Sequence, residues 1–194
     1  MSNDLGVSAQ TLLAVEDFPK ARISKFIPVD KTNLAEAVKI ARRALPNQQD
    51  KETATSDLYA SVYTRVYEKR YSADLYGPLN LRYFLVCDET GHAFGFCGMF
   101  ETIADLYSAS WMGWLCVQPE FQNNGIGAAM IQFCIDQARI KGADFLRVET
   151  SNQSMMARTN RILQRMQFAQ FDLTPSTKQS TETISLYLQH ELLR

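Results

Sequence analysis

The chain has 194 residues, of which 46% are hydrophobic and 21% charged, so it can bury a sizeable core as one globular domain. A formal net charge of −1 gives no overall electrostatic signature of binding to nucleic acid or to an acidic membrane surface. No apolar run is long enough to span a bilayer, and the residues before Val29 lack the apolar core of a signal peptide. We therefore expect a cytoplasmic protein that binds neither nucleic acid nor membranes.

Cysteine and histidine usage argues against disulfides and metal. The four cysteines, Cys87, Cys97, Cys116 and Cys134, lie in apolar runs without Cys-x-x-Cys spacing, which favours buried free thiols in a reducing compartment. His92 and His190 are far apart in the sequence and have no cysteine nearby, so we expect no metal site.

The N-terminal third predicts an extension, a strand and two helices. Residues 1–20 are polar and irregular and read as an extension, which leaves residues 21–194 as one domain. Residues 22–29 alternate as in a strand, and residues 33–45 follow with helical spacing. The polar residues 46–56 predict a loop before a helix over about 56–70. On that helix Tyr59, Tyr63, Tyr67 and Tyr71 form a stripe, which we interpret as half-buried packing rather than as the wall of a substrate pocket.

The central part predicts three antiparallel strands and then a helix that begins at a glycine pair. Residues 81–87 and 92–102 flank a turn at 88–91, and glycines within the second strand suggest a bulge or a close backbone neighbour. A third strand, residues 111–117, leads through a polar loop to a helix that opens at Gly125 and Gly127 and ends at Gly142. A helix start presents N–H groups without intrahelical partners, so this loop suits an anion, most readily a phosphate.

The remaining chain predicts a strand over 143–150, a helix over 152–166, and two more strands, 168–174 and 182–190. The strand after the glycine helix should lie parallel to the strand before the loop, because a helical crossover joins them. The predicted fold class is therefore α/β (α+β), with a mixed, mostly antiparallel sheet of about six to seven strands flanked by helices.

The segment VQPEFQNNGIGA, from Val117 to Ala128, resembles the V-x-P-x-[YF]-[RQ]-x-x-G-[IVL]-[GA] signature of the GNAT superfamily of acetyl-CoA-dependent N-acyltransferases. The resemblance implies that backbone N–H groups of the loop hold the coenzyme A pyrophosphate, and that the pantetheine arm adds to the end of the preceding strand. It also implies an N–H near Val117 that polarises the thioester carbonyl. The implied cofactor-binding residues are Leu115, Cys116, Val117, Gln122, Asn123, Asn124, Gly125, Ile126, Gly127, Ala128, Asn152 and Asn160.

Two departures from the family pattern bear on function. Many members carry a tyrosine after the next strand that protonates the departing thiolate, whereas the segment from Asn152 to Phe168 has none. Counting from Phe168 puts Leu163 at that position, and counting from Asn152 puts Thr159 or Asn160 there, because the segment is about one helical turn too long. The loop also carries Asn123 and Asn124 where many members have Arg or Lys, which suggests weaker coenzyme affinity.

The acceptor amine must lose a proton before it attacks, so a base or a water relay is required. Our candidate base is Glu101 at the end of a hairpin strand, with Asp105 and Glu149 as alternatives. Trp111 and Trp114 can line the cleft, although core packing is the expectation for at least one of them.

The resemblance implies an N-acetyltransferase that moves an acetyl group from acetyl-CoA to a primary amine of a small molecule or a protein, with a homodimer left open. The missing tyrosine keeps a non-catalytic acyl-CoA-binding or regulatory module as the alternative. A dinucleotide-binding oxidoreductase is excluded, because Met130 occupies the third glycine position and three antiparallel strands come first.

Overall fold

The structure is a computed structural model, and it describes residues 23, 25–64, 77–153, 156–171 and 185–192. The expectations for residues 1–20, for Tyr67 and Tyr71, and for the end of the second helix lie outside the described residues.

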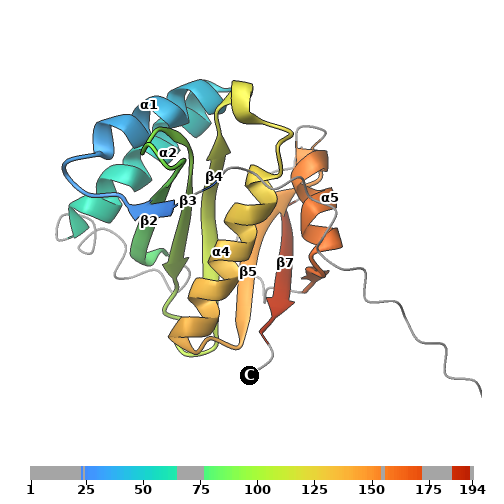
Figure 1. The fold of residues 1–194 in the computed structure, drawn as a ribbon. Coiled ribbons are helices and arrows are strands. Elements are labelled where there is room, and N and C mark those ends of the chain that lie inside the picture. The colour runs from blue at the N-terminus through green and yellow to red at the C-terminus, as the bar shows by residue number, and fades with distance from the viewer. Residues whose placement is uncertain (1–22, 24, 65–76, 154–155, 172–184, 193–194) are drawn as a thin grey trace, which may run out of the picture.

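In the described part of the chain, seven strands form one sheet in the order β1-β2-β3-β4-β5-β7-β6. Neighbouring strands are antiparallel except for β4 and β5, which run parallel (Figure 1). The sheet confirms the predicted mixed, mostly antiparallel architecture. The strands are β1 Lys25–Pro28, β2 Leu79–Cys87, β3 Ala93–Glu101, β4 Ala109–Val117, β5 Phe145–Ser151, β6 Ala169–Gln170 and β7 Ser185–Glu191.

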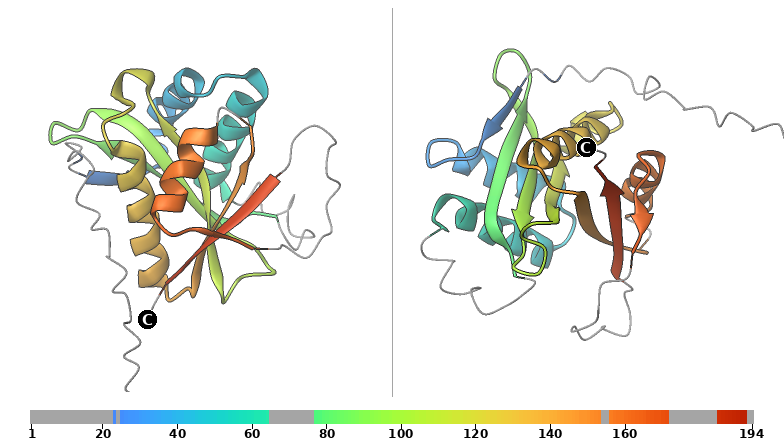
Figure 2. Two further views of the ribbon diagram at one scale, coloured as in Figure 1. Left: turned by 90° about the vertical axis from the view of Figure 1, so that its right-hand side faces the viewer. Right: turned by 90° about the horizontal axis from the view of Figure 1, so that it is seen from below.

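Helices cover both faces of the sheet and create two cores (Figure 2). On one face α1 (Leu34–Ala44) and α2 (Gln48–Val62) pack over β2, β3 and β4. On the other face α4 (Ile126–Lys141) and α5 (Ala157–Arg165) pack over β3, β4, β5 and β7. Within the residues described, no helix has the length and apolarity needed to cross a membrane.

The loop predicted over residues 46–56 is wrong, because α2 already begins at Gln48. The Asn47 side chain accepts a hydrogen bond from the Asp50 backbone N–H at 2.8 Å, which caps the helix. Only a narrow apolar stripe, including Ala54 and Leu58, is buried against the sheet, so the stretch is polar enough to look like a loop. Tyr59 is 46% exposed and Tyr63 is 43% exposed, which agrees with the predicted half-buried packing of these two residues.

The strands β4 and β5 separate halfway along their length. Their parallel pairing runs from Ala109 opposite Phe145 to Met112 opposite Val148, while β4 continues to Val117. The second half of β4 therefore presents a backbone edge that β5 does not cover. Because the Gln118 N–H donates to the Phe94 carbonyl of β3, the Val117 N–H points the other way, toward this open side.

A bulge in β4 lies where the two strands part. Between the pairs Cys97–Leu115 and Met99–Met112, β3 advances by two residues and β4 by three, so β4 carries one extra residue. Opposite the bulge a Cβ on Gly98 would meet the Tyr83 ring at 2.0 Å. The expectation of a bulge or a close neighbour at the strand glycines is confirmed.

Candidate active site

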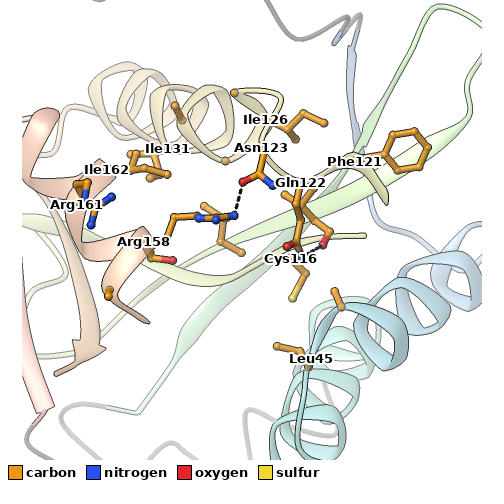
Figure 3. A pocket seen from close by; sticks show the side chains of 18 residues that line it. Leu45, Cys116, Phe121, Gln122, Asn123, Ile126, Ile131, Arg158, Arg161 and Ile162 are labelled. Carbon is orange, nitrogen blue, oxygen red and sulfur yellow. Dashed lines mark hydrogen bonds between the residues drawn. The ribbon is translucent and has the colours of Figure 1, made fainter. Parts of the chain in front are cut away.

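A cavity of about 730 Å³ opens where the loop after β4, the start of α4, the side of α5 and the end of α1 meet (Figure 3). Most of the residues predicted to hold a cofactor line it: Leu115, Cys116, Val117, Gln122, Asn123, Gly125, Ile126, Gly127 and Ala128. Asn124, Asn152 and Asn160 are not among its lining residues. The predicted residues therefore lie together around one cavity, whose other walls come from α1 and α5.

Side-chain amides of the loop before α4 hydrogen-bond to backbone carbonyls of the same loop and the end of β4. The Gln122 amide donates to the Val117 carbonyl at 3.1 Å, and the Asn124 amide donates to the carbonyls of Phe121 and Gln122, both at 3.3 Å. Asn124 thus stabilises the loop conformation without lining the cavity. Gly125 has φ of 77°, a left-handed conformation that glycine adopts without strain, and it turns the chain into the helix.

The first turn of α4 supplies anion-binding groups to the cavity. The first intrahelical bond runs from the Ala129 N–H to the Gly125 carbonyl, so the N–H groups of residues 125–128 lack partners within the helix. Together with the helix dipole they favour negative charge in the cavity. A Cβ on Gly127 would come no closer than 3.9 Å to Ile162 and Leu115. A methyl group at this position would therefore enter the cavity without clashing with the protein.

Arginines of α5 form a wall that the sequence interpretation missed. Arg158 and Arg161 are exposed, line the cavity and lie across it from the loop, and the Arg158 guanidinium is hydrogen-bonded to the Asn123 side chain (Figure 3). They add the positive charge that the loop itself lacks. Their spacing of three residues on one helix was the available signal, because residues three apart share a helix face.

Asn160 ties α5 to β5. Its carbonyl accepts from the Thr150 hydroxyl at 2.8 Å, and its amide donates to the Ser151 carbonyl at 2.8 Å. With both ends of the amide engaged, this geometry argues against the predicted cofactor contact. Leu163, the alternative at the tyrosine position, is fully buried in the core. Asn152 is exposed just beyond the end of β5.

Glu101, our candidate base, is buried among structural partners, and these contacts argue against a catalytic role. It is 2% exposed, pairs with Lys141 in the last turn of α4, and accepts from the Asn80 amide at 2.6 Å. A third group, the Arg82 guanidinium, lies 3.5 Å away. The cavity lies at the first turn of α4, whereas Lys141, the partner of Glu101, lies in the last turn. The length of the helix, about 20 Å, therefore separates Glu101 from the anion site.

The two alternative carboxylates occupy different environments. Asp105 accepts from the Trp111 indole at 2.8 Å and forms an ion pair with Arg147 at 2.5 Å, so its oxygens are committed to structure. Trp111 itself is buried in the core. Glu149 is exposed on β5, in the register position opposite Tyr187.

Residues 80–170 match the acetyltransferase (GNAT) domain family. This segment of the chain is similar to a GNAT domain. The match covers β2 to β6, which includes the separated strands and the whole glycine loop. It confirms the resemblance and the prediction of an acyltransferase enzyme.

Solved structures support the same fold. A GNAT-family acetyltransferase from Desulfovibrio desulfuricans aligns with a TM-score of 0.66 and 15% identity, over 87% of this chain and 99% of that one. The ribosomal-protein-S18-alanine N-acetyltransferase of Escherichia coli gives 0.57 and 16%, over 87% and 93%. The NatC complex bound to Gag peptide and CoA gives 0.56 and 15%, over 87% and 98%. A search of curated proteins finds no significant match.

Proposed function

We propose that the chain is an N-acetyltransferase that takes its acetyl group from acetyl-CoA and passes it to a primary amine. The observation that carries this proposal is the continuity of one cavity: it joins the first turn of α4, the arginines of α5 and the uncovered edge of β4. Coenzyme A would bring a pyrophosphate, a 3′-phosphate and an extended amide arm to these three walls.

Each wall suits one part of the coenzyme. The N–H groups at the start of α4 would hold the pyrophosphate, as the helix dipole favours. Arg158 and Arg161 would pair with the 3′-phosphate, so we expect coenzyme affinity to be supported from α5 in spite of Asn123 and Asn124. The open edge from Leu115 to Val117 would pair with the pantetheine amides like an added strand.

The chemistry follows from the same edge. When bound, the coenzyme supplies a thioester, whose carbonyl carbon is open to attack by a neutral amine. The N–H groups of Leu115 and Val117 both point outward along this edge. The Leu115 N–H, which is nearer the bulge, is a preorganised donor that can stabilise negative charge on the thioester carbonyl oxygen, and such stabilisation is usually the largest single contribution to catalysis. The acceptor amine would approach the thioester where β4 is no longer paired with β5.

A non-catalytic acyl-CoA-binding module is the second candidate, and one observation favours it. The position where many relatives carry an acidic tyrosine is either the buried Leu163 or the structurally engaged Asn160. Such a module would bind the coenzyme without transferring its acetyl group.

A transfer assay separates the two functions. The protein is incubated with acetyl-CoA and a panel of primary amines (a short peptide with a free N-terminus, a lysine amide and a polyamine), and both free thiol and acetylated amine are measured. We expect thiol and product in equal amounts from the wild type. Coenzyme binding without product would support the module, and absence of both binding and product would refute the proposed function.

A further inference from the structure

On the face of the sheet opposite α4, a carboxylate from α2 meets the β4 bulge. Asp57 accepts a hydrogen bond from the Trp114 indole at 2.9 Å. Trp114 lies two residues beyond Met112, the last residue of β4 that pairs with β5. Asp57 is therefore held at the point where β4 and β5 separate, on the side of the sheet that α1 and α2 cover.

Tyr83 supports the backbone at Trp114, the residue that donates to Asp57. The Tyr83 ring crosses β3 over Gly98, and its hydroxyl is hydrogen-bonded to the backbone of Trp114. Gly113 leaves room for that hydroxyl, because a Cβ there would lie 3.2 Å from it. Tyr83 therefore supports the bulge from within the sheet, and the Trp114 indole in turn orients Asp57.

The electrostatics of Asp57 differ from those of Glu101 and Asp105, the two carboxylates that are buried in the described part of the chain. Glu101 and Asp105 each have a cationic partner, whereas no ion pair of the described residues involves Asp57. Burial raises the pKa of Asp57, and the Trp114 hydrogen bond lowers it in part. Tyr83 is the titratable group that interacts with it, and burial together with the Asp57 charge raises the pKa of Tyr83 well above its usual value, so that phenol stays neutral. A desolvated carboxylate without a cation is costly unless a ligand supplies the positive charge.

We propose that Asp57 receives the acceptor: its carboxylate binds the protonated primary amine at the β4 bulge and accepts one of its protons. This inference rests on the proposed function and names the acceptor class, a cationic amine, and the residue that selects it. The amine lone pair then forms the C–N bond while the C–S bond breaks, and the thiolate leaves with the electron pair. The remaining excess proton on nitrogen passes to the thiolate, and Asp57 later releases its own proton to water.

The test uses Asp57→Asn, which keeps an oxygen that can accept from the Trp114 indole but removes the charge. Coenzyme binding is measured by calorimetry, and kcat/KM is measured with the amine panel across pH. We expect coenzyme affinity to stay within about twofold, while kcat/KM falls by about 10²-fold or more. The part of the ascending limb that follows ionisation of Asp57 should disappear, which leaves only the rise that follows deprotonation of the amine itself. Asp136→Asn, a carboxylate on the exposed face of α4, is the matched control and should leave both quantities unchanged.

A second variant, Trp114→Phe, tests the orientation of Asp57. It removes the hydrogen bond that lowers the pKa of Asp57, so that pKa should rise and the ascending limb should move to higher pH. If the wild type transfers acetyl groups and Asp57→Asn keeps its kcat/KM and pH profile, the role of Asp57 is overturned while the proposed function stands. If the wild type binds the coenzyme but acetylates no amine, both proposals are overturned.

Discussion

At Gly127, at the start of α4, substitution by alanine should raise the stability of the fold but weaken the binding of coenzyme A. A methyl group there would lie in ordinary contact with Ile162 and Leu115, at 3.9 Å, and would clash with nothing. Gly→Ala at a site that accepts alanine stabilises a protein by about 0.4–1 kcal/mol, through the entropy of the unfolded chain. For a domain of this size that corresponds to an increase in Tm of about 1–4 °C.

The same methyl group would stand between the helix N–H groups and a bound pyrophosphate. We expect Gly127→Ala to weaken coenzyme A binding by about tenfold or more, equivalent to about 1.4 kcal/mol, and Gly127→Val to weaken it further. Thermal unfolding and calorimetric titration with coenzyme A measure the two effects on the same samples.

Gly142, at the other end of α4, provides a control of opposite sign. Its φ is 82° and a Cβ there would have no neighbour within 4 Å, so alanine is strained without being crowded. Gly142→Ala should lower stability by about 1 kcal/mol and leave coenzyme affinity unchanged. Gly127→Ala that binds coenzyme A as tightly as the wild type would refute the placement of the pyrophosphate.

Three further predictions concern charges. Arg158→Ala and Arg161→Ala should each weaken binding of coenzyme A but not of its 3′-dephospho form. The control, Arg139→Ala at the far end of α4, should change the affinity for neither ligand. Equal losses of affinity for both ligands in calorimetry would disprove the phosphate contact. Glu101→Gln should lower the free energy of unfolding by about 1–3 kcal/mol in urea and leave kcat unchanged, because its partners are structural; a selective loss of kcat would restore Glu101 as a base. Burial lowers the pKa of His190 below its usual 6.5, so the unfolded chain binds a proton more readily than the folded chain. The free energy of unfolding should therefore fall as the pH drops below about 6.5. His190→Gln should lose this pH dependence, and an unchanged dependence in the variant would assign it to other groups.

The sequence predicted the sheet and the glycine loop well because both have local signals. Alternation, turn residues and the glycine pair depend on the backbone of neighbouring residues, and the signature from Val117 to Ala128 forms one continuous loop and helix start. The segment from Asn152 to Phe168 is about one helical turn longer than the family pattern. Counting from its two ends therefore gave different residues at the tyrosine position. The structure resolves this ambiguity by fixing Asn160 against β5 and burying Leu163.

Long-range pairings account for what the sequence did not predict. Glu101 looked like a free acid at a strand end, and its partner Lys141 is forty residues away in the chain. Asp57 stood near the start of a predicted helix with nothing to distinguish it, and its partner is an indole on β4. The α5 arginines acquire a role only when that helix is placed across from the loop. Pairings of this kind depend on the tertiary packing of distant elements, so local residue patterns do not reveal them.

Isoleucine methyl groups offer the most direct test of where coenzyme A binds. Ile126, Ile131 and Ile162 line the cavity, whereas Ile40 lies in the other core and Ile140 is 79% exposed near the end of α4. In a methyl NMR titration with coenzyme A, the account predicts saturable shifts at the three cavity isoleucines and little change at Ile40 and Ile140. The absence of shifts, or shifts centred on the other isoleucines, would contradict it.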